Sequence, residues 1–136
     1  MHIYISHREQ DAPLVRELAQ RLHEAGFDAW NPYDEVEPGE NWSKRAGTAL
    51  ERSDVIVILL TPKARQSEAL LRDVQFALAS KKHKCRVLSI LVGANMAATD
   101  VPWILLKLPH VQVDSVRDGV ADIVRELQNV MPAASK

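Results

Sequence analysis

Short apolar runs alternate along the chain with segments whose apolar residues have helical spacing. The strongest run covers residues 54–61, which are apolar and largely β-branched from Val55 to Leu60. A strand of this kind is buried on both faces, so we predict a central strand of a parallel sheet. Four weaker runs predict the remaining strands, at residues 2–6, 27–30, 86–92 and 110–113.

Helical spacing predicts the first and last helices of the chain. The first follows Asp11, its expected N-cap, and ends before Gly26, its expected C-cap glycine. The last is expected to be capped by Asp114 or Ser115. The inward positions are Leu14, Val15, Leu18, Leu22 and Ala25 in the first helix, and Val116, Val120, Ile123, Val124, Leu127 and Val130 in the last.

Two further helices and one shorter helical piece are predicted in the middle of the chain. One helix opens at Asn41, and another covers residues 67–80. Pro102 and Pro109 limit any helix within residues 97–108 to a few turns. The inward face of the 67–80 helix consists of Leu70, Leu71, Val74, Ala77 and Leu78.

Strands that alternate with helices predict a parallel sheet with right-handed crossovers. The expected fold class is α/β: a flavodoxin-like three-layer sandwich, with a five-stranded parallel sheet and helices on both faces. We expect one domain over residues 1–131 and a C-terminal tail over residues 132–136. In open sheets of this type the ligand crevice lies beyond the carboxyl ends of the strands. Those ends carry residues 6–8, 31–33, 61–63, 93 and 114–115.

The composition fits one globular domain. Of 136 residues, 46% are hydrophobic and 26% charged, and the formal net charge is −1. This balance supplies no global field for nucleic acid or an anionic membrane, and the basic residues 81–84 are interpreted as a solvated helix end. A single cysteine, Cys85, cannot form an internal disulfide and fits a reducing compartment. No apolar run reaches the roughly 20 residues of a membrane helix, and the N-terminus lacks signal-peptide character. We therefore expect a cytoplasmic protein.

Several familiar site types lack their motifs. Neither GxGxxG nor GxxxxGK[ST] is present for nucleotide binding, and no GxSxG marks a hydrolase nucleophile. The five histidines have no metal-ligand spacing, so no metal site is expected. A phospho-acceptor receiver domain shares the predicted layout. It requires acids at the ends of the first and third strands, where this chain has Ser6, His7 and Thr61.

Five motifs follow one another over nearly the whole chain. They are Ile3-Tyr4-Ile5-Ser6-His7 with Asp11 ("FISH/Y…D"); Leu18, Leu22, Gly26, Phe27 and Trp30 ("L…L…G…W"); Glu37-Pro38-Gly39-Glu40-Asn41-Trp42 ("PGxxW"); Ala49-Leu50-Glu51-Arg52-Ser53-Asp54 with residues 55–60 ("AL..S…ivll"); and Ser67-Glu68 with Asp73 and Ala77 ("SEW…E…A"). Each motif alone is short. In this order and spacing, they resemble the Toll/interleukin-1 receptor (TIR) domain family.

The resemblance implies two kinds of function. Many TIR domains are signalling modules that assemble with other TIR domains. Others cleave the nicotinamide–ribose bond of NAD, with a glutamate on the third helix as the central residue. In this chain Asp73 occupies the position of that glutamate, and Ala69 occupies that of the tryptophan four residues earlier. NAD would be the substrate, and no separate cofactor is expected.

Asp73 has two interpretations. At 100° per residue it falls on the edge of the apolar stripe of its helix, beside the expected crevice. A carboxylate there could bind ribose hydroxyls and stabilise a developing oxocarbenium ion. Aspartate is one methylene shorter than glutamate, and a displacement of about 1 Å can cost on the order of a hundredfold in rate, so slow catalysis is expected. The alternative is a solvated helix residue paired with Arg72 or Lys63.

The other substrate-binding candidates are placed by the strand ends or by the resemblance. Arg8 could bind a pyrophosphate or carboxylate with two hydrogen bonds, or it could be a surface arginine. Arg45 and Lys63 could neutralise phosphate charge. Tyr33 and Trp30 could stack on a base, although Trp30 fits the core better. The predicted substrate-binding residues are Ser6, His7, Arg8, Tyr33, Arg45, Lys63 and Ala69.

A predicted interface completes the set of candidate sites. Residues 31–39 form an acidic, proline-bearing loop, which by resemblance corresponds to the loop that TIR domains use for assembly and for gating the pocket. A plain solvated connection is the alternative. Phe76 lies off the core stripe, so it lines a pocket, meets a partner, or is an ordinary exposed aromatic. The predicted interface residues are Asp34, Glu35, Pro38, Gly39 and Phe76.

Two functional hypotheses result. The first is an NAD glycohydrolase or cyclase that is activated when copies assemble. The second is a non-enzymatic TIR–TIR interaction module. The residues at 73 and 69 favour the second, whereas a polar, arginine-bearing crevice favours the first, to which we lean. The expected partners are NAD or a related dinucleotide and other TIR domains, with neither nucleic acid nor membrane.

Overall fold

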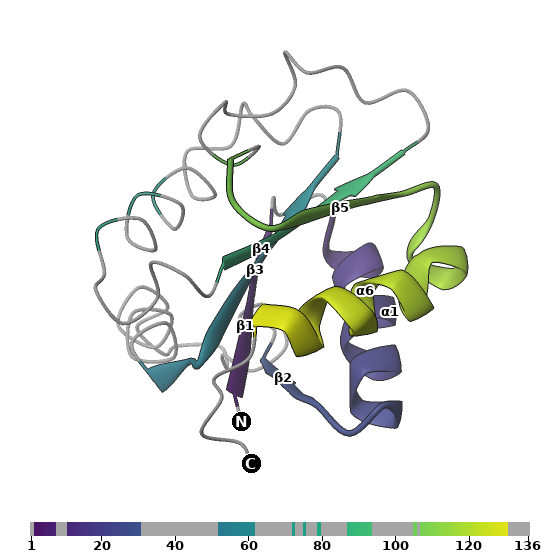
Figure 1. Cartoon of the computed structure of the whole chain (residues 1–136). Coiled ribbons are helices and arrows are strands. Elements are labelled where there is room, and N and C mark those ends of the chain that lie inside the picture. The colour runs from purple at the N-terminus through teal and green to yellow at the C-terminus, as the bar shows by residue number, and fades with distance from the viewer. Residues whose placement is uncertain are drawn as a thin grey trace, which may run out of the picture.

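The computed structural model describes residues 2–7, 11–30, 52–61, 87–93 and 107–130, together with Arg72, Gln75, Ala79 and Leu105. Within these ranges five strands form one sheet in the order β2-β1-β3-β4-β5, and every neighbouring pair is parallel (Figure 1). The elements are β1 (His2–Ser6), α1 (Ala12–Glu24), β2 (Asp28–Trp30), β3 (Val55–Leu60), β4 (Val87–Val92), β5 (His110–Val113) and α6 (Val116–Val130). The predicted flavodoxin-like α/β fold is confirmed.

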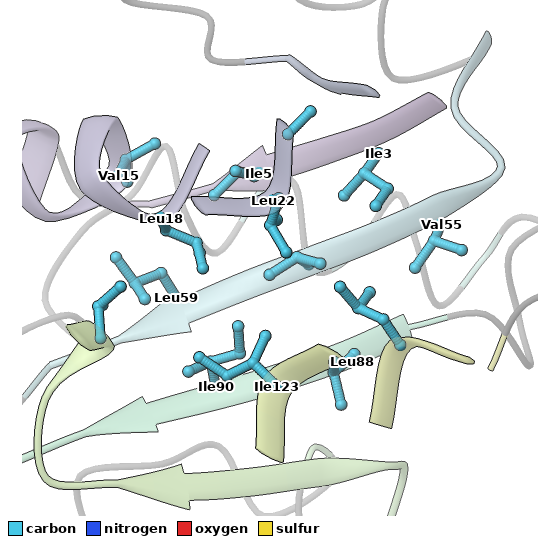
Figure 2. Close-up of a cluster of buried hydrophobic side chains, with 14 of the residues drawn as sticks. Ile3, Ile5, Val15, Leu18, Leu22, Val55, Leu59, Leu88, Ile90 and Ile123 are labelled. Atoms are coloured by element: carbon cyan, nitrogen blue, oxygen red, sulfur yellow. The ribbon is translucent and has the colours of Figure 1, made fainter. Parts of the chain in front are cut away.

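The helices α1 and α6 pack on the same face of the sheet, and the main core lies between them and the strands. Figure 2 shows side chains of α1 and α6 meeting those of β1, β3 and β4 in this layer. Alternate residues of each strand point into it, as the two-residue period of a strand requires. The labelled members are Ile3, Ile5, Val15, Leu18, Leu22, Val55, Leu59, Leu88, Ile90 and Ile123.

The opposite face of the sheet is also covered. Every residue of β3 and β4 is buried, including those whose side chains point away from α1 and α6. This confirms the prediction that residues 55–60 form a central strand covered on both faces. Of the predicted 67–80 helix the structure describes Arg72, Gln75 and Ala79, which are helical and exposed. None of these three positions belongs to the predicted inward stripe.

The strand and helix limits differ from the predicted ones by small amounts. The second strand begins at Asp28 rather than Phe27, which is half-buried against the core. Ala25, predicted on the inward face of the first helix, is exposed, because the chain turns there after the last helical residue, Glu24. The closing helix extends over the predicted residues, and the second helix, opening at Asn41, lies outside the described residues.

The ends of the two helices show how the sequence sets their limits. Gly26 follows α1 with a φ of 95°, a left-handed conformation that favours glycine, as predicted. At the start of α6, Ser115 rather than Asp114 is the cap, because its Oγ accepts a 3.1 Å hydrogen bond from the Asp118 N–H. Asp11 holds the N-cap position of α1 but makes no side-chain hydrogen bond to its own helix. Its carboxylate is used elsewhere.

The amino end of the sheet is joined by contacts of His2. Its backbone N–H donates to Oδ2 of Asp54 at 2.9 Å, and the Asp54 N–H donates to the His2 carbonyl oxygen at 2.8 Å. The His2 ring lies 2.7 Å from a carboxylate oxygen of Asp28. These contacts link the starts of β1, β2 and β3, so the amino edge is occupied by structural pairs.

A candidate site at the carboxyl edge of the sheet

The chain reverses its direction of progress across the sheet between β1 and β3. From β1 it passes through α1 to β2 on one side, whereas β3 lies on the other side of β1. In open α/β sheets, ligands bind outside the carboxyl ends of the strands at such a switch point. Ser6, the last residue of β1, is opposite Ile58, and β3 continues past this level to Leu60. The edge therefore has a step of about 7 Å at the switch point, at a rise of roughly 3.3 Å per residue.

Ser6 and His7 lie at the lower level of this step. Both are buried, with exposed fractions of 1% and 4%. The Nδ1 atom of His7 is 3.3 Å from the Ile5 carbonyl oxygen, so the ring turns back along the strand. A carbonyl oxygen can only accept, so this hydrogen bond requires the proton on Nδ1. The structure thus brings together two predicted substrate-binding residues, with both side chains enclosed by protein.

Asp11 and Thr61 form a buried pair across the switch point. The Thr61 hydroxyl donates a 2.8 Å hydrogen bond to Oδ2 of Asp11, although the residues are separated by 50 positions in sequence. Their exposed fractions are 5% and 6%. Asp11 immediately precedes α1 and Thr61 immediately follows β3, so this bond joins the helix start to the strand end. Asp11 was predicted as a helix cap and Thr61 as a strand end, but no sequence pattern paired the two residues.

At the carboxyl ends of β4 and β5, the polar groups bond to one another. Gly93, with a φ of 126°, donates its N–H to the Val113 carbonyl oxygen at 3.0 Å. The Gln112 amide donates to the Gly93 carbonyl oxygen at 3.4 Å. With Ser115 occupied as a helix cap, these polar groups serve local structure. The candidate site is therefore the β1–β3 step.

The remaining predicted site residues lie outside the described part of the chain. Among the substrate-binding and catalytic predictions, these are Arg8, Tyr33, Arg45, Lys63, Ala69 and Asp73. Among the interface predictions, they are Asp34, Glu35, Pro38, Gly39 and Phe76. Their roles stay predictions.

A separate hollow of about 310 Å³ lies along α1. It is lined by Arg16, Glu17, Gln20, Arg21 and Glu24. Because α1 begins at the carboxyl edge and these residues follow toward its C-terminal end, the hollow is distinct from the β1–β3 step. Its lining alternates in charge, as is typical of a solvated helix face.

The described residues were also compared with the requirements of a metal centre and of a membrane segment. They contain no group of three or more His, Cys, Asp or Glu side chains arranged to hold a metal ion. None of the helices formed by these residues is long and apolar enough to cross a membrane.

Comparison with known families identifies the chain. A family model described as the TIR domain matches residues 3–127, from the second residue of β1 into the last turns of α6. The chain belongs to the TIR domain family. The resemblance inferred from the five motifs is thereby confirmed.

One relative in sequence is a probable 2′ cyclic ADP-D-ribose synthase from Brachypodium distachyon. It is 29% identical to this TIR domain over 82 residues, which are 59% of the chain and 37% of the relative. The chain therefore spans well under half the length of this relative.

Solved structures share the fold at lower identity. The TIR domain of a Toll-related receptor from Hydra magnipapillata superposes with a TM-score of 0.72 at 18% identity, covering 93% of this chain and 98% of the other. A CMP N-glycosidase from Clostridium botulinum superposes with a TM-score of 0.63 at 14% identity, covering 92% and 98%. At these identities the similarity shows a common architecture.

Proposed function

We propose that this TIR domain cleaves NAD at the nicotinamide–ribose bond and that it does so when copies assemble. The observation that carries the proposal is the match to a probable 2′ cyclic ADP-D-ribose synthase, an enzyme named for making a cyclic ADP-ribose. Support also comes from the β1–β3 step, where polar Ser6 and His7 end a strand at the switch point of the sheet.

The proposed reaction breaks one bond. The C1′–N bond of the nicotinamide riboside cleaves, and its electron pair moves to the pyridinium nitrogen, releasing neutral nicotinamide. The ribosyl C1′ acquires oxocarbenium character, which a nearby carboxylate stabilises electrostatically. Water then attacks C1′ and loses a proton, giving ADP-ribose, or a hydroxyl of the same molecule attacks and gives a cyclic product. We assign the carboxylate role to Asp73, by its position in the family motif.

The second candidate is a TIR–TIR interaction module without enzymatic activity. It is favoured by the residues at two positions of the family motif, Asp73 for glutamate and Ala69 for tryptophan. In this case residues 31–39 and Phe76 would contact other TIR domains, and the β1–β3 step would have no substrate.

Incubation of concentrated protein with NAD separates the two proposals. Nicotinamide, ADP-ribose and cyclic ADP-ribose are measured by liquid chromatography over hours, since slow turnover is expected. The wild type is compared with Asp73→Ala, and with Gln75→Ala as a matched control at an exposed position of the predicted 67–80 helix. We expect release from the wild type and from Gln75→Ala, and loss in Asp73→Ala.

The Asp73→Glu variant tests for an increase in rate, whereas Asp73→Ala tests for a loss. If the site is intact but its carboxylate is one methylene short, glutamate increases the rate, by on the order of ten- to a hundredfold. Equal nicotinamide levels in the wild type and Asp73→Ala, with no increase in Asp73→Glu, would reject NAD cleavage. Self-association without nicotinamide release, measured by light scattering at the same concentrations, would favour the interaction module.

A further inference from the structure

Asp11 and Thr61 form a buried hydrogen-bonded pair that the usual role of an N-cap residue does not explain. The residue at a helix N-cap normally accepts a hydrogen bond from the first turn of its own helix. Asp11 holds that position in α1, but its carboxylate accepts the Thr61 hydroxyl at 2.8 Å. The local helix cap has been exchanged for a contact with a distant strand.

Burial adds a free-energy cost to the contact between Asp11 and Thr61. A carboxylate taken out of water loses hydration, which only hydrogen bonds and nearby charge can replace. Asp11 is 5% exposed and Thr61 is 6% exposed. A neutral or apolar pair would fill this position without that penalty. The short bond from a hydroxyl to a carboxylate instead fixes the start of α1 relative to the end of β3.

The two joined points lie at the carboxyl edge of the sheet, one at the start of α1 and the other at the end of the strand that pairs with β1. The strand β1 ends at Ser6, His7 follows it, and Asp11 immediately precedes α1. On the other side of the step, Thr61 directly follows Leu60, the last residue of β3. The Asp11–Thr61 bond therefore joins the start of α1 to the end of β3, the strand that pairs with β1 and its last residue, Ser6.

We infer that Asp11 and Thr61 are positioning residues of the NAD site. Their hydrogen bond joins the start of α1 to the end of β3, and so steadies the end of β1, where Ser6 and His7 lie beneath the proposed site. The inference rests on the proposed NAD cleavage, because it assigns the pair to that reaction. Neither residue is proposed to contact the bond that breaks.

Thr61→Val tests the inference, because valine has nearly the shape of threonine but cannot donate. Below the unfolding temperature of each variant, we expect kcat/KM for nicotinamide release to fall about tenfold, the scale of losing one hydrogen bond to a charged group. Thr61→Ser keeps the hydroxyl and should remain within about twofold of the wild type. A merely structural role would lower the unfolding temperature and leave kcat/KM of the folded protein unchanged.

Amide hydrogen exchange gives a readout that does not depend on NAD. In Thr61→Val, exchange should accelerate at Ser6, His7 and Leu60, while β4 and β5 keep their protection. The matched control is Ser89→Ala, which removes a buried hydroxyl from β4 and should leave the β1 end unchanged.

Each result has a distinct meaning. Unchanged exchange at Ser6 and His7 in Thr61→Val overturns the inference, whatever the activity. Faster exchange there with unaltered kcat/KM also overturns it, since the pair would then be structural only. A wild type that releases no nicotinamide contradicts the proposed NAD cleavage instead, and the exchange pattern still shows whether the pair holds β1 to β3.

Discussion

Gly119 of α6 lies so close to Val113 of β5 that a Cβ atom at position 119 would collide with the Cγ1 atom of that valine. Gly119 is buried, and its N–H bonds to the Ser115 carbonyl oxygen at 3.0 Å in the first turn of the helix. Glycine in a helix interior costs about 1 kcal/mol relative to alanine. Here the absence of a side chain allows the helix to approach the strand.

Gly119→Ala is therefore expected to destabilise the protein despite the better helix propensity of alanine. Overpacking in a core typically costs about 1–3 kcal/mol, so we expect a net loss of this order in the free energy of unfolding. Urea unfolding followed by circular dichroism measures it, with Asn129→Ala on the exposed face of α6 as the control. In a Val113→Gly background, which removes the Cβ atom of Val113 together with both methyl groups, the loss should shrink. An undiminished loss there would show that Val113 is not the obstacle.

Gly26 should respond differently from Gly119, because its requirement lies in the backbone. With a φ of 95° and no atom within 4 Å of an added Cβ, it has space but an unfavourable conformation for other residues. We expect Gly26→Ala to lower the free energy of unfolding by about 1 kcal/mol, with Gly26→Asn costing less. Equal stability of the alanine variant and the wild type, in the same urea titration, would contradict this explanation.

Ser89 is expected to be a position at which a smaller, apolar residue improves stability. Its side chain is fully buried in β4, and within the part of the chain that the structure describes its Oγ has no hydrogen-bond partner. Since an unsatisfied buried hydroxyl costs about 1–3 kcal/mol, Ser89→Ala should raise the free energy of unfolding by about 1 kcal/mol. Calorimetry of both proteins tests the sign, and a clear loss would mean that the hydroxyl is bonded.

Ser115 provides the opposite case. Its Oγ accepts the Asp118 N–H and so caps α6. Ser115→Ala should lower the free energy of unfolding by about 1 kcal/mol, whereas Ser115→Asp retains an acceptor and should stay close to the wild type. The pair of variants separates loss of the cap from loss of the serine itself in the same calorimetric experiment.

The strands were predictable because their signal is local. Residues 55–60 have the continuous apolar, β-branched character that burial on both faces requires, and the closing helix follows its apolar stripe from Val116 to Val130. Such patterns are visible in any short window of sequence. The one-residue error at Phe27 arose because a half-buried aromatic before a three-residue strand resembles the strand itself.

Contacts between distant residues were not predictable in the same way. Asp11 was expected to cap α1, since nothing near it in sequence indicates a competing donor 50 positions away. Likewise, no sequence pattern indicated that β5 would pack closely against Gly119. At the candidate site, Ser6 and His7 were located correctly at a strand end, but their burial is a property of the folded chain that no local pattern reveals. The strand ends, the helical spacing and the family resemblance supplied the remaining candidates.

The strand order also bears on how the chain folds. The first strand pairs with β3, so His2 and Asp54, 52 residues apart, must meet before the centre of the sheet exists. Parallel pairing over such separations slows folding, because the chain loses loop-closure entropy before the stabilising contacts between the strands can form. During synthesis, β1, α1 and β2 would therefore wait with an open strand edge until residue 60 leaves the ribosome. This TIR domain should therefore acquire its stability late, once β3 has paired with β1.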